Sequence, residues 1–112
     1  MRTSVVELAE FIRKAKAIMS DAERMALIDF LSENPEAGIS LGGGVRKLRF
    51  ARSGGGKSGG YRVIHYYSSQ GDGPVFLLTA FAKNDKANLT AAETAAISAF
   101  AQALAKGHGR QQ

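Results

Sequence analysis

The sequence predicts a two-layer α+β domain, and three observations carry that prediction. Apolar residues with helical spacing fill the first third of the chain, over residues 8–33. Strand-like segments then follow one another with short turns over residues 45–81. A last alanine-rich segment again has helical spacing. At 112 residues the chain has room for one modest core. We therefore expect a single domain over residues 1–112, with residues 107–112 as a flexible tail.

The N-terminal part predicts a short strand and a helical hairpin. Val5 and Val6 favour the strand, and the helical spacing of the first helix begins directly after it. A capping-box pattern at residues 20–23 predicts the start of a second helix, and Asn34-Pro35 predicts its end. The residues of this second helix that we expect to face the core are Met25, Ile28 and Leu31.

Three consecutive strands are predicted after the glycine run of residues 42–44. Residues 45–52 alternate, so that Lys47 and Arg49 are predicted to face away from the core. A second strand is expected over residues 61–67. Residues 75–81 are apolar on both faces and predict the central, most buried strand.

The short connections between these strands require antiparallel neighbours. We expect the helical hairpin and the last helix to cover one face of this small antiparallel sheet, leaving Lys47 and Arg49 on the open face. The last helix is predicted to start at a second capping box, residues 90–93, and to end near Ala105. Its expected core-facing residues are Ala92, Ala96, Phe100 and Leu104.

The charge pattern is the strongest functional signal. No acidic residue lies between Glu36 and Asp72, and the net charge of the chain is +5. The basic residues of this window are Arg46, Lys47, Arg49, Arg52, Lys57 and Arg62. Such a concentration of positive charge is typical of proteins that bind a polyanion, nucleic acid above all.

Composition excludes several other classes. The chain has no cysteine, which rules out disulfides and thiolate metal sites. It contains no apolar stretch of the roughly 20 residues that a membrane span needs, and the N-terminus lacks a signal peptide. We therefore expect a cytoplasmic protein.

The segment Gly54-Gly-Gly-Lys-Ser58 resembles a phosphate-binding P-loop, but its context does not fit. Ala51 stands where the motif needs its first glycine, and a strand rather than a helix is predicted to follow. Two interpretations of this loop remain open. It is either a plain hairpin connection or a loop that lets Lys57 contact a nucleic-acid backbone.

The predicted strand over residues 61–67 supplies aromatic candidates. Its tyrosines alternate faces, so that core packing and stacking on RNA bases are both open. His65 has no second histidine or carboxylate at ligand spacing, which disfavours a metal site. The candidate RNA-binding residues are Arg46, Arg52, Lys57, Tyr61, His65 and Tyr66.

No set of side chains typical of a hydrolase is evident, neither paired carboxylates nor a Ser/His/Asp set. Phosphoryl chemistry assisted by cations is compatible with this composition. In RNA the 2′-hydroxyl can attack its own adjacent phosphate, and arginine and lysine can neutralise the charge that develops.

Four segments closely resemble the RelE/HigB superfamily of bacterial type II toxins, and the HigB-like branch most strongly. The resemblance covers the chain from about Val5 to Leu104. The segments are Val45-Arg-Lys-Leu-Arg-Phe-Ala51, Gly56-Lys-Ser-Gly-Gly-Tyr-Arg-Val-Ile64, Phe76-Leu-Leu-Thr79 and Ala82-Lys-Asn-Asp-Lys86. The resemblance implies a RelE-like fold and a ribosome-dependent messenger-RNA endonuclease without a cofactor or metal. It also implies neutralisation by an antitoxin, commonly a helix-turn-helix DNA-binding protein, through which the pair binds operator DNA and regulates its own operon.

The resemblance also implies roles for single residues. Arg62 matches an arginine that contacts the scissile phosphate, and Lys47 and Arg49 match a basic pair of which one acts as base. Lys83 and Lys86 match a basic loop that stabilises charge or protonates the leaving group. No phenol occurs at Asn88, Leu89 or Thr90, where RelE proper has a tyrosine shortly beyond its arginine, so the catalytic acid is unassigned and His65 is one substitute.

Two other functions remain open from the sequence. One is a non-catalytic module that uses the basic sheet only to hold RNA or the antitoxin. The other is a toxin of the same fold that poisons DNA gyrase, as ParE-type relatives do. The glycine-lysine loop and the segment Lys83-Asn-Asp-Lys86 favour the endonuclease over the gyrase poison.

Overall fold

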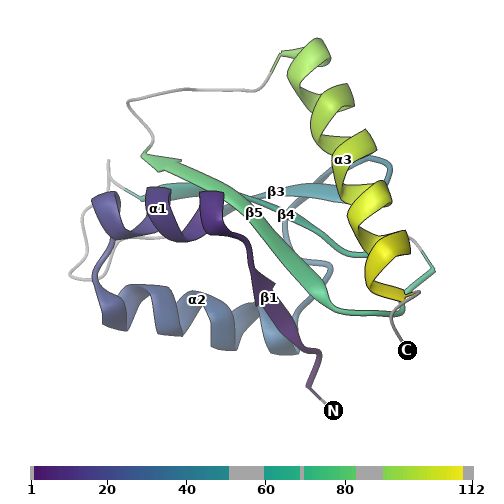
Figure 1. Cartoon of the computed structure of the whole chain (residues 1–112). Coiled ribbons are helices and arrows are strands. Elements are labelled where there is room, and N and C mark those ends of the chain that lie inside the picture. Colours follow the sequence, from purple (N-terminus) through teal and green to yellow (C-terminus); the bar gives the residue numbers. More distant parts are fainter. Residues whose placement is uncertain (1, 51–59, 69, 83–89, 110–112) are drawn as a thin grey trace.

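The computed structural model describes residues 2–50, 60–68, 70–82 and 90–109. Within these residues, helices and strands follow in the predicted order, and the α+β class is confirmed (Figure 1). The elements are β1 (Val5–Glu7), α1 (Ala9–Ile18), α2 (Asp21–Glu33), β2 (Ile39–Gly42), β3 (Val45–Phe50), β4 (Tyr61–Tyr66), β5 (Val75–Ala82) and α3 (Ala91–Gly109).

The described strands form one five-stranded sheet with the order β1-β5-β4-β3-β2. The predicted meander of β3, β4 and β5 is antiparallel throughout. The sheet is nevertheless mixed, because β1 pairs with β5 in parallel, from Val5 opposite Val75 to Glu7 opposite Leu77. Residues 39–42, for which the sequence predicted no strand, form β2, which pairs with β3 at the other edge.

The hairpin of α1 and α2 packs on one face of the sheet. Its buried residues Phe11, Leu27 and Leu31 meet Val63 of β4 and Leu77 of β5. The capping box at the start of α2 is confirmed, because the backbone N–H of Ser20 donates to the Glu23 carboxylate and the N–H of Glu23 donates to the Ser20 hydroxyl.

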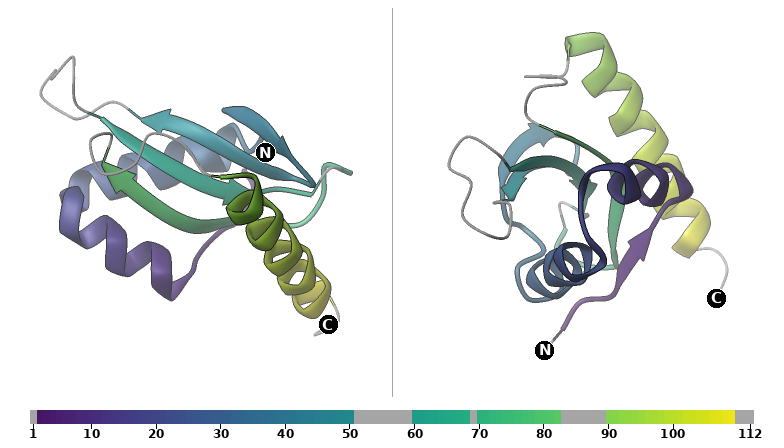
Figure 2. Two further views of the ribbon diagram at one scale, coloured as in Figure 1. Left: turned by 90° about the horizontal axis from the view of Figure 1, so that it is seen from above. Right: turned by 90° about the vertical axis from the view of Figure 1, so that its left-hand side faces the viewer.

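Helix α3 packs on the opposite face, so the expectation that one face stays uncovered is wrong. Ala101, Ile97 and Leu104 contact a second cluster that includes Val45 and Tyr66 of the sheet. In Figure 1 the hairpin lies to the left of β5 and α3 to its right, and the left view of Figure 2 shows α3 set apart from the hairpin. The second face is therefore covered by α3 at the end where β3 begins and β4 ends.

Helix α3 also differs from the prediction in length and in the face that it buries. It continues to Gly109, beyond the expected end at Ala105, because one glycine at position 107 costs a helix only about 1 kcal/mol. Phe100, predicted to face the core, is 58% exposed. The helix is alanine-rich on every side, so the spacing of its apolar residues does not select one face.

In the described part of the chain, no helix combines the length and the apolar character needed to span a membrane.

Candidate nucleic-acid interface

A cluster of three basic side chains lies at the end of the sheet that α3 leaves open. Arg49 of β3 pairs directly with Arg62 of β4 in the antiparallel register. Lys47 precedes Arg49 by two residues and therefore shares its face, because side chains alternate along a strand. Arg49 is exposed, whereas Lys47 and Arg62 are half-buried. We call Lys47, Arg49 and Arg62 the basic cluster.

In the part of the chain that the structure describes, no carboxylate pairs with the two arginines of the basic cluster. Among the described residues, neither Arg49 nor Arg62 takes part in an ion pair or a side-chain hydrogen bond. Side chains directly opposite each other in an antiparallel pair have Cβ atoms about 5 Å apart, and like charges there are destabilising. An anion such as a phosphate group would relieve this repulsion by accepting hydrogen bonds from both guanidinium groups.

The other predicted catalytic and basic residues lie outside the described residues. These are Arg52, Lys57, Lys83 and Lys86. The register still fixes where their segments join the sheet. Phe50 at the end of β3 pairs with Tyr61, and Tyr61 pairs with Ala82 at the end of β5. Both segments are thus attached at the end of the sheet that carries Arg49 and Arg62.

Arg46, one of the predicted RNA-binding residues, does not join the basic cluster. Its position next to Lys47 places it on the other face of β3. There its guanidinium donates to the backbone carbonyls of Glu36, at 2.8 Å, and Gly38, at 3.3 Å. Arg46 therefore holds the connection between α2 and β2 against the sheet.

The three aromatic candidates are also buried rather than displayed, which corrects their assignment as RNA-binding residues. Tyr61 is 0% exposed, and its hydroxyl donates to the Glu23 carboxylate at 2.9 Å. Tyr66 packs in the cluster under α3, with its ring centroid 6.3 Å from that of Phe76. Because helices cover both faces of β4, these rings fill the two cores.

His65 is buried on the hairpin face, on the opposite side of β4 from Arg62. Its Nε2–H donates to the carbonyl of Ala37 at 3.1 Å, which makes Nδ1 the unprotonated nitrogen of the neutral ring. Within the described residues Nδ1 has no hydrogen-bond partner. Burial lowers the pKa of His65 from 6.5 to about 4, an effect that the Ala37 carbonyl opposes and the charge of Arg46 increases. His65 is thus neutral near pH 7 and does not substitute for the missing phenol.

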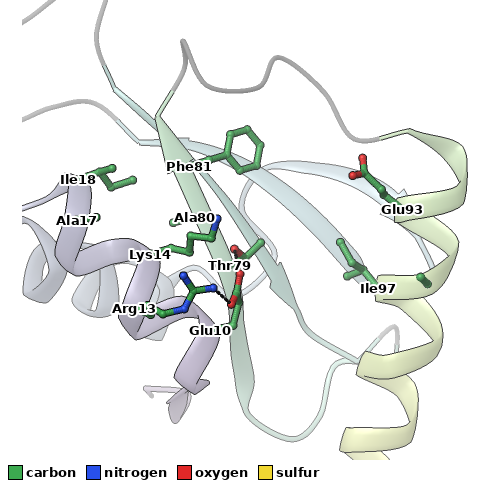
Figure 3. Close-up of a pocket in the computed structure, with 11 residues that line it drawn as sticks. Glu10, Arg13, Lys14, Ala17, Ile18, Thr79, Ala80, Phe81, Glu93 and Ile97 are labelled. Atoms are coloured by element: carbon green, nitrogen blue, oxygen red, sulfur yellow. Dashed lines mark hydrogen bonds and ion pairs between the residues drawn. The ribbon is translucent and has the colours of Figure 1, made fainter.

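An open groove of about 720 Å³ lies beside the basic cluster, between α1 and α3 (Figure 3). Its floor is formed by the end of β5, from Thr79 to Phe81. No local sequence signal predicts this groove, because it forms only when α1 and α3, which are distant in sequence, flank β5. The residues that line it are Glu10, Arg13, Lys14, Ala17, Ile18, Thr79, Ala80, Phe81, Glu93, Ala96 and Ile97.

One known protein family matches almost the whole chain. A sequence model of one protein family, described as RelE toxin of the RelE / RelB toxin-antitoxin system, matches residues 4–111 of the chain. The match includes every helix and strand that the structure describes.

Proposed function

We propose that this chain, which belongs to the RelE toxin family, is an endoribonuclease that cleaves messenger RNA on the ribosome. Family membership makes it the toxin of a toxin–antitoxin pair, and its partner is an antitoxin. The observation that carries the enzymatic proposal is the cross-strand pair Arg49–Arg62, two arginines that face each other without a carboxylate among the described residues. Such a pair fits a single phosphate group.

In the proposed reaction the RNA supplies its own nucleophile. A 2′-hydroxyl loses its proton to a base and attacks the adjacent phosphorus, forming a new P–O2′ bond. The P–O5′ bond breaks, and the leaving 5′ oxygen takes up a proton. The products are a 2′,3′-cyclic phosphate and a free 5′-hydroxyl. The negative charge rises on the non-bridging oxygens in the transition state, where cations placed in advance are most effective.

Each residue of the basic cluster has its own proposed role in this reaction. Arg62 is half-buried and lies on β4, a strand flanked by neighbours on both sides, so we assign it to the scissile phosphate. Arg49 contributes the second guanidinium. Lys47, on the same face as Arg49, is the proposed base. Protonation of the leaving group is proposed for Lys83 or Lys86, whose segment joins the sheet after Ala82.

The partners are proposed from the family resemblance. We propose a cytoplasmic toxin of the HigB-like branch whose antitoxin is a helix-turn-helix protein, with operator DNA contacted only through that antitoxin. A reading frame for a small helix-turn-helix protein next to this one would support the branch assignment.

The test is to map transcript 5′ ends after brief induction of the wild-type chain, Arg62→Ala and Arg2→Ala. The wild type is expected to create new 5′ ends within translated regions. Arg62→Ala is expected to lower their yield by about 100-fold or more, the usual effect of removing one group that stabilises the transition state. Arg2→Ala is the matched control, because it likewise removes one arginine, here an exposed one that is paired with Asp29 of the hairpin.

Three outcomes would contradict the proposal. Undiminished cleavage by Arg62→Ala would show that the site is wrong. Growth arrest without new 5′ ends would indicate a non-catalytic binding module. DNA breaks with intact messages would indicate a gyrase poison.

A further inference from the structure

Phe81 is an aromatic side chain on the same face as the basic cluster. It is the register partner of Arg62, which in turn is the partner of Arg49. Arg49, Arg62 and Phe81 therefore form one row across three neighbouring strands. Neighbouring strands lie about 4.8 Å apart, so the ring begins about one strand spacing from the nearer arginine. One nucleotide bridges such a distance between its phosphate and its base.

The ring of Phe81 is accessible from the groove. Phe81 is half-buried: it packs against the cluster under α3 and also lines the groove between α1 and α3. Figure 3 shows the ring projecting from β5 toward α3. Apolar side chains flank the groove on both sides, with Ile18 on α1 and Ile97 on α3. The groove thus has the flat aromatic surface and the apolar walls that an unstacked base requires.

The α1 side of the groove adds positive charge. Arg13 is paired with Glu10, but Lys14 is exposed and forms no ion pair or side-chain hydrogen bond among the described residues. Lys14 is therefore available for a second phosphate on the far side of the groove from Arg62. A nucleobase in the groove would then lie between two phosphate contacts, one at Arg62 and one at Lys14. This arrangement is the one expected for a single strand of RNA that crosses β5.

We propose that the groove is a nucleobase subsite, in which the base next to the scissile phosphate stacks on Phe81. This inference rests on the proposed RNA cleavage and adds to it the way in which the strand is positioned. Bases of single-stranded RNA are commonly held by stacking on aromatic side chains, worth about 1–3 kcal/mol per base, or about 5- to 150-fold in affinity. A peptide segment of the antitoxin is the alternative occupant, but the continuity of the groove with the arginine row favours RNA.

The experiment compares Phe81→Leu with the wild type and with Phe100→Leu, in a translation reaction supplied with a defined message. Leucine keeps the apolar packing under α3 while it removes the aromatic face. Phe100 is a matched control, since it is an exposed phenylalanine that does not line the groove. Two quantities are measured: the cleavage rate, and the base frequencies at the nucleotides flanking each cut.

We expect Phe81→Leu to cleave at least about fivefold more slowly and to show altered base frequencies beside the cut, whereas Phe100→Leu behaves like the wild type. A purely structural role of Phe81 would lower the rate without changing those frequencies, and that result would overturn the subsite. Wild-type rate and frequencies in Phe81→Leu would overturn it while leaving the proposed cleavage intact. Loss of antitoxin binding by Phe81→Leu with unchanged cleavage would assign the groove to the antitoxin instead. If the wild type itself makes no cuts, the proposed function fails and the subsite fails with it.

Discussion

The pair Arg49–Arg62 is an unfavourable contact in the isolated protein. Like charges that face each other across two strands cost about 0.2–1 kcal/mol, and salt screens part of that cost because Arg49 is exposed. An arrangement that lowers stability is common at functional sites, where the ligand supplies the missing partner.

Replacing Arg49 by threonine is therefore expected to leave the free energy of unfolding unchanged or to raise it by up to about 1 kcal/mol. Threonine suits a strand, so the loss of side-chain packing on this surface is small. Urea unfolding at low and high salt checks this, with the difference between the two proteins shrinking as salt rises. A loss of more than 2 kcal/mol would instead mean that Arg49 has a structural role.

His65 makes the stability of the fold depend on pH. The folded protein binds the proton with a pKa of about 4, whereas the unfolded chain binds it near 6.5. Between these values the unfolded state holds more protons, so acid favours unfolding. The stabilisation is fully present above pH 6.5 and is lost as the pH falls toward 4, by about 3 kcal/mol in total.

Unfolding measured across pH 4–7 checks this pH dependence, and His65→Phe should remove most of it above pH 5. An equally steep dependence in that variant would place the titrating group elsewhere.

At the scale of the elements, the connection between α2 and β2 is fixed by two features that no periodicity reveals. Arg46 donates to the carbonyls of Glu36 and Gly38, and Gly38 has a positive φ of 96°. A Cβ atom at Gly38 would lie 2.5 Å from the carbonyl oxygen of Lys47. The connection therefore packs directly on the strand that carries Lys47.

Gly38→Ala is expected to destabilise the protein by about 1–3 kcal/mol through backbone strain, with the contact to the Lys47 carbonyl adding to it. Gly42→Ala is the matched control, because Gly42 also has a positive φ, of 100°, but a Cβ there meets nothing within 4 Å. Thermal unfolding of both variants separates two costs. The cost of backbone strain is common to both, whereas the cost of the contact with the Lys47 carbonyl arises only in Gly38→Ala. Equal losses of stability would show that the contact with β3 is unimportant.

The sequence predicted those elements whose signals are local. The capping boxes at Ser20 and Thr90 were found because the paired residues lie three positions apart, and both are formed in the structure. The face of α2 was predicted in part only. Leu31 is buried as expected, but Met25 is 62% exposed and Leu27 takes its place in the core. Met25 and Leu27 are both apolar, so their spacing along the helix does not determine which of them is buried. Packing against the sheet determines it.

A strand at Val5 and Val6 was predicted, but its parallel pairing, the strand β2 and the groove were not, because all three depend on contacts between distant segments. β1 pairs with β5, and β2 becomes a strand by pairing with β3. In the candidate site, alternation correctly placed Lys47 and Arg49 on one face, whereas the position of α3 was needed to decide that Tyr66 is covered. The burial of Tyr61 and His65 likewise depends on the hairpin.

For the whole molecule, charge is segregated between the hairpin and the sheet. The ion pairs among the described residues join partners within the N-terminal third of the chain: Arg2 with Asp29 and Glu33, Arg13 with Glu10, and Arg24 with Glu7. Four carboxylates of that region, Glu7, Glu10, Asp29 and Glu33, are thus paired locally. Among the residues that the structure describes, Arg49 and Arg62 have no such partners, which favours a positive field at this end of the sheet.

This segregation predicts the salt dependence of RNA binding. Each phosphate contact to single-stranded RNA contributes about −0.7 to the slope of log K against log salt concentration. Replacing Arg49 or Arg62 by alanine is expected to reduce the magnitude of that slope by about 0.7, because one contact and its released counterion are lost. Arg2→Ala lowers the net charge of the protein by the same amount, but it removes the charge from the hairpin side. It should therefore leave the slope unchanged. Fluorescence titration of a labelled single-stranded RNA at several salt concentrations gives the three slopes. If all three variants reduce the slope alike, the RNA responds to net charge alone, and the sheet end is not the binding surface.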